Sequence, residues 1–78
     1  MKKYMVVEHY KANCYEKIYK RVAEQGRMLP DGCYYLNSWV NKEKNICFQL
    51  METDNKLLFE EWIEKWKDLI DFEVYSID

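Results

Sequence analysis

Glycine, proline and histidine are scarce in this chain, whose 78 residues include two glycines, one proline and one histidine. So few turn-forming residues exclude a collagen-like or loop-rich protein. Hydrophobic residues make up 49% of the chain, which excludes intrinsic disorder. A single histidine argues against a structural zinc site within one subunit. We therefore predict neither a metal site nor a cofactor.

The chain also lacks a long apolar run and an excess of charge of one sign. No stretch reaches the ~18 apolar residues needed to span a bilayer, and no apolar signal segment follows Lys2 and Lys3. Twelve basic residues are scattered among 14 acidic ones, for a formal net charge of −2, so no basic stripe is available for a nucleic acid. We expect a soluble, cytoplasmic protein with no nucleic-acid or membrane partner.

Cysteine is present, but not in a pattern that carries chemistry. Cys14, Cys33 and Cys47 are odd in number and widely spaced, which fits neither a disulfide framework nor a CxxC pair. We interpret all three as reduced, small hydrophobic residues.

The N-terminal third of the chain carries a strand signal and then a helix signal. The segment KYMVVEHYK, residues 3–11, has the β-branched and aromatic composition of a strand. In NCYE, Asn13 precedes Glu16 by three positions, the pattern of an N-terminal capping box. Gly26 can end or interrupt the helix. The apolar face of this helix consists of Tyr15, Ile18, Tyr19 and Val22.

The middle of the chain predicts a hairpin. LPDG, residues 29–32, has turn chemistry and precedes a strand at CYYLNSWV, residues 33–40. The polar NKEKN, residues 41–45, connects this strand to ICFQLME, residues 46–52. The two strands are expected to pair antiparallel.

The strongest periodic signal predicts a second helix. Thr53, Asp54 and Asn55 offer side chains for its N-cap. The segment DFEVYSI, residues 71–77, then predicts a fourth strand. The apolar residues that recur at the spacing of one helix face are Leu58 or Phe59, Trp62, Ile63, Trp66, Leu69 and Ile70.

The predicted order of elements is β-α-β-β-α-β, in one domain that covers residues 1–78. With right-handed crossovers, this order gives a ferredoxin-like α+β fold, in which both helices cover one face of a four-stranded antiparallel sheet. The other face is left bare in a chain too short to bury much of its surface. We expect a homodimer whose two sheets pack face to face and close a dimeric α/β barrel around a shared cleft.

Several segments resemble, in this order, a family of short bacterial proteins classified only as a domain of unknown function: GRMLPDG, YLNSWV, CFQLMETD, EEWIEKW and DLIDFEV. More distantly, the chain is similar to the dimeric α/β-barrel superfamily, which includes cofactor-free monooxygenases, haem-degrading and haem-using enzymes and small isomerases. The resemblance implies the fold and assigns no activity. Haem-degrading relatives use an Asn, a Trp and a His, but Asn13, Trp66 and His9 do not match that motif locally, so the site is not carried over.

Because side chains alternate along a strand, each expected strand divides into two sets. The sets expected to meet the helices are Ile46, Phe48 and Leu50, then Leu36 and Val40, and finally Phe72 and Val74. The sets expected to face the barrel are Cys47, Gln49 and Met51, then Tyr35, Asn37 and Trp39, and finally Glu73, Tyr75 and Ile77. The first strand is ambiguous, and we place Glu8 and Tyr10 in the cleft and His9 on the helix side.

The candidate cleft residues are Glu8, Arg27, Tyr35, Asn37, Trp39, Gln49 and Tyr75. Glu8 is the best candidate for catalysis, as a general base, if burial raises its pKa toward neutrality. Equally, Glu8 could pair with Arg27 or a lysine. Gln49 and Asn37 could orient a ligand or form hydrogen bonds across a dimer.

The remaining candidates also have two interpretations each. Trp39, Tyr35 and Tyr75 could form an aromatic wall for a planar ligand, although dimer interfaces favour aromatic residues too. Arg27 lies in the turn-rich GRMLPDG loop, where it could hold a carboxylate or phosphate, or pair with Asp31 or an acid of a partner subunit.

Two functions are compatible with the sequence. In the first, the cleft binds a small, partly aromatic or carbonyl-bearing molecule, with proton-transfer or cofactor-free oxidation chemistry of the isomerase or oxygenase type. In the second, side chains fill the barrel and the protein is a non-catalytic structural or interaction module. A buried Glu8 with a raised pKa beside an open cavity would favour the first, and a packed barrel axis the second.

Overall fold

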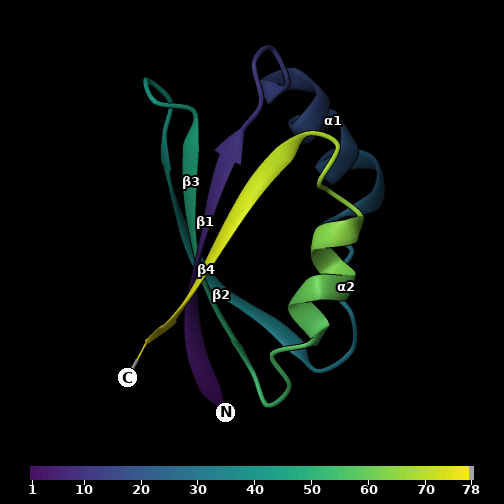
Figure 1. Cartoon of the computed structure of the whole chain (residues 1–78). Coiled ribbons are helices and arrows are strands. Elements are labelled where there is room, and N and C mark those ends of the chain that lie inside the picture. Colours follow the sequence, from purple (N-terminus) through teal and green to yellow (C-terminus); the bar gives the residue numbers. More distant parts are fainter. Residues whose placement is uncertain (78) are drawn as a thin grey trace.

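The computed structural model describes residues 1–77 and contains the elements that the sequence predicts, in the predicted order. These elements are β1 (Lys2–Tyr10), α1 (Tyr15–Gln25), β2 (Cys33–Asn41), β3 (Ile46–Thr53), α2 (Leu58–Glu64) and β4 (Ile70–Ile77). The strands form one sheet in the order β2-β3-β1-β4, and every neighbouring pair is antiparallel. Both helices lie on one face of the sheet (Figure 1). The predicted ferredoxin-like α+β fold is confirmed.

Aromatic side chains dominate the core between the sheet and the helices. Phe59 and Trp62 are the buried residues of α2. The ring of Phe59 meets Tyr4 of β1 edge-on with 5.1 Å between centroids, and Trp62 meets Phe72 of β4 at 5.3 Å. Ile18 is the buried residue of α1. Such edge-to-face pairs stabilise the fold beyond the area that they bury.

Asn13 is not the N-cap of α1, so this prediction is wrong. Cys14 precedes the helix, and no side chain caps it. Asn13 has a φ of 61° and lies in a turn whose Cys14 N–H donates to the Lys11 carbonyl oxygen. A side-chain cap needs a residue with β-region backbone next to the first helical residue. Asn13 is left-handed and lies one residue too early, so it does not fill this position. Gly26 does end the helix, and its N–H donates to the Val22 carbonyl oxygen.

Two of the side chains predicted to cap the second helix, those of Thr53 and Asn55, instead accept hydrogen bonds in the turn before it. The Asn55 N–H donates to Thr53 Oγ1 at 3.1 Å, and the Leu57 N–H donates to Asn55 Oδ1 at 3.1 Å. Leu57 is the residue that immediately precedes α2, and it makes no side-chain cap. Thr53 and Asn55 therefore shape the turn that delivers the chain to the helix.

The second helix is shorter than its apolar periodicity predicts. It ends at Glu64, and residues 65–69 form turns that lead into β4. Trp66, Leu69 and Ile70 are buried as expected, but Ile70 is the first residue of a strand. In the turns, bonds such as that from the Leu69 N–H to the Trp66 carbonyl oxygen keep a helix-like spacing, which explains the error in length.

On β1 and β3 the prediction of which side chains face the helices is wrong. The residues buried beneath the helices are Tyr4, Val6 and Glu8 of β1 and Cys47, Gln49 and Met51 of β3. Ile46, Phe48 and Leu50 lie on the opposite side of the sheet, which we call the bare face. Directly paired residues share a face. Glu8 pairs with both Phe72 of β4 and Cys47 of β3, so the three lie together under the helices.

A β-bulge changes the phase of β2 between Tyr35 and Asn37. Before the bulge, Tyr35 pairs with Met51 and so lies on the helix side, contrary to the prediction. After it, Trp39 pairs with Phe48, and both lie on the bare face. Asn37 and Trp39 therefore face away from the helices, as predicted. A bulge adds one residue to a strand, and alternation alone does not reveal it.

No helix within residues 1–77 combines the length and apolar character needed to cross a membrane. The three cysteines are free thiols, and Cys33 and Cys47 are buried. These two thus pack as the small hydrophobic residues that the sequence predicts.

Candidate functional site

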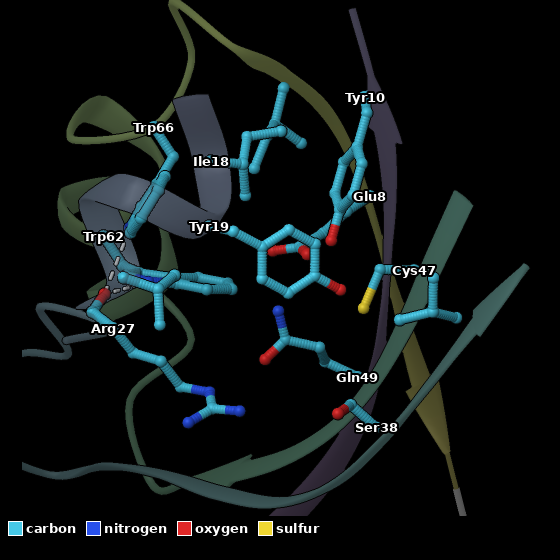
Figure 2. A pocket seen from close by; sticks show the side chains of 13 residues that line it. Glu8, Tyr10, Ile18, Tyr19, Arg27, Ser38, Cys47, Gln49, Trp62 and Trp66 are labelled. Atoms are coloured by element: carbon cyan, nitrogen blue, oxygen red, sulfur yellow. Dashed lines mark hydrogen bonds between the residues drawn. The ribbon is translucent and has the colours of Figure 1, made fainter. Parts of the chain in front are cut away.

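A cavity of about 160 Å³ lies between the sheet and the helices. The sheet supplies five polar side chains to its lining, namely Glu8 and Tyr10 from β1, Ser38 from β2, and Cys47 and Gln49 from β3 (Figure 2). Cavities of roughly 150 Å³ hold a molecule of the size of benzene. The space is therefore sufficient for one ring or a short chain.

The walls of the cavity are mainly apolar and aromatic. Ile18, Tyr19 and Val22 of α1 form one side, and Trp62 and Trp66 form another. Ligand sites typically combine such walls with a few convergent polar groups that orient the ligand. Val40 and Ile70 complete the apolar lining.

Glu8 is the most buried charged residue of the cavity, with 3% of its surface exposed. Burial raises its pKa from 4.5 to about 7, because a carboxylate loses its hydration there. Gln49, Cys47 and the positive charge of Arg27 act in the opposite direction but do not cancel the effect. Glu8 therefore exists in both protonation states near neutral pH, as a general acid or base requires.

Gln49 presents an unpartnered acceptor to the same space. Its side chain is 7% exposed, and among residues 1–77 its Oε1 atom has no hydrogen-bond partner. A buried carbonyl oxygen without a partner costs free energy. Figure 2 shows the Gln49 amide directed among the lining residues, on the side of Arg27 and Tyr19. A ligand that donates a hydrogen bond would satisfy this atom.

Two phenols and a thiol stay protonated around the cavity. Burial raises the pKa of Tyr10 above its ordinary value and that of Cys47 to about 11. A hydrogen bond with Tyr15, followed by burial, raises the pKa of Tyr19 to about 12. Tyr10 and Tyr19 are therefore hydroxyl donors at neutral pH. Cys47 is a neutral thiol, which is not the form that acts as a nucleophile.

Arg27 lies at the edge of the cavity, in a loop that the indole groups hold in place. Trp62 Nε1 and Trp66 Nε1 each donate to the Arg27 carbonyl oxygen at 3.0 Å. Lys65 Nζ donates to the next carbonyl oxygen, that of Met28, at 3.2 Å. The Arg27 guanidinium lies over the ring of Tyr35, with its carbon 3.7 Å from the ring centroid. This stacking fixes the cation beside the cavity.

The structure divides the predicted site residues between two places. Glu8, Gln49 and Arg27 line the cavity, and Tyr35 supports Arg27. The cavity itself is between the sheet and the helices, whereas we predicted it on the other side of the sheet. The remaining predicted residues lie on the bare face and not at this cavity: Asn37, Trp39 and Tyr75.

The bare face carries a polar network of its own. His9 Nε2 lies 2.7 Å from Glu73 Oε1, and the Tyr75 hydroxyl donates to the same carboxylate. The bonds from Tyr75 and His9 lower the pKa of Glu73. We predicted His9 on the helix side, and this is wrong because Val7 and His9 alternate with the buried Val6 and Glu8.

Several cavity residues were not among the sequence candidates. Trp62 and Trp66 were expected only as part of an apolar helix face, and they are indeed core residues, but they also line the cavity. Nothing in the local sequence around Cys47 or Tyr19 indicated that these residues line a cavity. No group of three or more His, Cys, Asp or Glu residues within 1–77 is arranged to hold a metal ion.

Residues 2–77 match the family described as "Domain of unknown function (DUF3303)". No curated protein and no solved structure shows significant similarity to the chain. The match confirms the resemblance to a domain of unknown function. Membership of the dimeric α/β-barrel superfamily stays a prediction.

Proposed function

The chain belongs to the family described as Domain of unknown function (DUF3303), and from that premise we propose that it binds a small, partly aromatic or carbonyl-bearing molecule between its sheet and helices. We further propose that Glu8 exchanges a proton with this molecule. The observation that carries the proposal is a buried carboxyl group, with a pKa of about 7, that lines an open cavity. Perturbed carboxyl groups in clefts are typical of functional sites.

The chemistry follows from two groups, Glu8 and Tyr10, and from the apolar walls around them. The ionised Glu8 takes a proton from a carbon next to the ligand's carbonyl group, and the electron pair moves onto the carbonyl oxygen. Tyr10 supplies a neutral hydroxyl that can donate to this oxygen as negative charge develops. The apolar walls exclude water and strengthen these interactions. Where the ligand also carries a carbon–carbon double bond conjugated with this enolate, proton return to the far carbon of that bond gives isomerisation. Addition of dioxygen to the carbanion, followed by protonation, gives a hydroperoxide and thus a cofactor-free oxygenation.

Acetophenone tests the proposal because it has one ring, one carbonyl group and exchangeable methyl protons. We expect titration to shift the backbone NMR signals of Glu8, Cys47 and Gln49 and to leave that of Phe48 on the bare face unchanged. In D2O at pH 7, the protein should accelerate loss of the methyl proton signal. Acceleration of about 100-fold is the lower end of what general-base catalysis supplies.

Two variants separate binding from proton transfer. Glu8→Gln resembles the protonated carboxyl group in shape, so it should still bind acetophenone but lose the accelerated exchange. Glu43→Gln, in the exposed turn between β2 and β3, should retain both. If the wild type binds acetophenone but does not accelerate its proton exchange, the proposal is reduced to a binding site. If acetophenone shifts none of the NMR signals of the cavity residues, the proposal is contradicted.

We also propose that a homodimer forms through the bare face. The support is that large apolar side chains are exposed there, namely Tyr34, Trp39, Phe48, Tyr75 and Ile77. Aromatic residues are enriched in the cores of protein interfaces, and an exposed apolar patch of this kind is rare on monomers. The same face supports the alternative function, a non-catalytic interaction module, in which the cavity would have no ligand.

A further inference from the structure

The chain has two arginines, and among residues 1–77 only one of them has an acidic partner. Arg21 makes two parallel hydrogen bonds with Asp68, at 2.9 and 2.8 Å. The Arg27 guanidinium forms no hydrogen bond or ion pair with any group among residues 1–77. It makes a cation–π contact with the ring of Tyr35. A planar fork of donors is therefore available at the edge of the cavity.

The position of this free guanidinium is set by the protein. The Arg27 carbonyl oxygen accepts bonds from two buried indoles, and the next residue, Met28, has a φ of 58°. A positive φ is rarely adopted by a residue other than glycine, so the surrounding contacts must hold it. The loop therefore keeps the Arg27 side chain next to the Tyr35 ring, where it is ready for an anion.

The interior of the cavity selects for a different chemical group. Glu8 and Gln49 are nine-tenths buried or more, and a second carboxylate placed beside Glu8 would lose its hydration next to a like charge. The unpartnered Oε1 of Gln49 instead requires a hydrogen-bond donor. Exposed Arg27 favours an anion at the edge, and buried Gln49 favours a hydroxyl inside.

We propose that the ligand is a small carboxylate that also carries a hydroxyl or enol group. Its carboxylate binds the Arg27 guanidinium through two parallel hydrogen bonds, and its hydroxyl group enters the cavity and donates to Gln49 Oε1. The carboxylate thus stays near solvent, and the neutral end fills the space between the aromatic walls. This inference rests on the ligand-binding function proposed above and adds the class of ligand.

Three single-ring probes test the two contacts separately. 4-Hydroxybenzoate has both groups, 4-hydroxybenzamide lacks the negative charge, and benzoate lacks the hydroxyl. We expect the wild type, titrated by NMR at pH 7 and low salt, to bind 4-hydroxybenzoate about tenfold more tightly than either of the other two. Low salt keeps the partly exposed ion pair from being screened.

Matched variants assign each preference to its residue. Arg27→Gln should remove the preference for 4-hydroxybenzoate over 4-hydroxybenzamide, whereas Lys17→Gln, which removes the same charge from the exposed surface of α1, should keep it. Gln49→Met keeps the side-chain volume without the carbonyl oxygen. It should remove the preference for 4-hydroxybenzoate over benzoate.

The outcomes separate this inference from the function on which it rests. Equal affinity of the wild type for 4-hydroxybenzoate and 4-hydroxybenzamide overturns the carboxylate assignment, while cavity shifts with acetophenone would still support the proposed function. A preference that survives Arg27→Gln overturns the role of Arg27. If none of the three probes shifts a cavity signal, the inference is wrong, and if acetophenone also fails, so is the proposed function.

Discussion

The burial of Glu8 has an energetic cost that depends on pH. Removal of a carboxylate from water without a matching cation costs on the order of several kcal/mol. The folded state therefore favours the protonated form of Glu8. Arg27 lowers the pKa of Glu8 only in part, because its guanidinium is exposed and lies over Tyr35. A group that destabilises the fold and lines a cavity is more easily explained by function than by stability.

The raised pKa predicts how stability changes with pH. The pKa of Glu8 is about 7 in the folded state against an ordinary value of 4.5, so the unfolded chain releases this proton first. The stabilising contribution of protonated Glu8 is fully present below pH 4.5 and is lost as the pH rises through about 7. The loss is on the order of 3 kcal/mol. Urea unfolding at a series of pH values measures it.

Glu8→Gln provides the comparison for this measurement. Glutamine does not ionise, so the free energy of unfolding of Glu8→Gln should rise relative to that of the wild type between pH 4.5 and 7. Glu43→Gln alters an exposed carboxyl group and should follow the wild-type profile. Parallel curves for the wild type and Glu8→Gln would show that the pKa of Glu8 is not raised.

At the residue scale, the sequence identified part of the site. Glu8 and Gln49 were candidates because strand alternation placed them in a predicted cleft, and Arg27 because it lies in a turn-rich loop; all three line the cavity. Cys47 and Tyr19 were not candidates, because a thiol or a phenol is as common in a core as in a site. Their role depends on neighbours that are distant in sequence.

At the scale of elements, the connection from α1 to β2 determines the edge of the cavity. Gly26 ends the helix with φ 67° and ψ −161°, a combination that only glycine adopts readily. The next residue is Arg27, whose carbonyl oxygen is held by Trp62 and Trp66. The backbone geometry of Gly26 therefore directs the chain so that Arg27 reaches the cavity.

Gly26→Ala tests this role. Within residues 1–77, no heavy atom beyond Gly26 and its two chain neighbours lies within 4 Å of the position that an added Cβ would take, so the effect should come from the backbone alone. We expect the free energy of unfolding to fall by about 1–3 kcal/mol, measured in urea. Gln25→Ala, one residue earlier on the exposed end of the helix, should change it by less than about 0.5 kcal/mol. An unchanged free energy of unfolding in Gly26→Ala would show that the loop relaxes to another conformation.

The strands show what periodicity leaves undecided. On β4 the acidic Asp71 and Glu73 alternate with Phe72 and Val74, so the helix-facing set was predicted correctly. On β3 both sets contain apolar residues, and the more hydrophobic set proved to lie on the bare face. The buried set of β3 was decided by its register with β1, which in turn pairs with β4, and that of β2 by a bulge. Neither the register nor the bulge is visible in the sequence of one strand.

At the scale of the whole molecule, two layers leave one side of the sheet uncovered. The helices bury one face, and the bare face exposes Trp39 at 50% and Tyr75 at 53%. A second copy placed on this face would bury both residues and leave the cavity on the far side of each sheet. The proposed dimer and the proposed ligand site therefore do not compete for the same surface.

Trp39→Glu tests the dimer. A negative charge in place of a large apolar side chain at the proposed interface should raise the dissociation constant at least about tenfold, as for other interface hot spots. Leu57→Glu is the control, because Leu57 is 67% exposed in the turn before α2 and not on the bare face. Light scattering after size-exclusion chromatography, or native mass spectrometry, measures the mass. A monomeric wild type would contradict the proposal.

The sequence by itself determined the order and type of the elements and, through them, the ferredoxin-like fold. Local patterns are sufficient for this, since apolar spacing, turn residues and β-branched runs each act within a few residues. Only the tertiary structure decided which face of β1 and β3 is buried, and hence that the cavity lies beneath the helices. Register joins residues far apart in the chain, such as Glu8, Cys47 and Phe72, and a shift of one position exchanges the two faces.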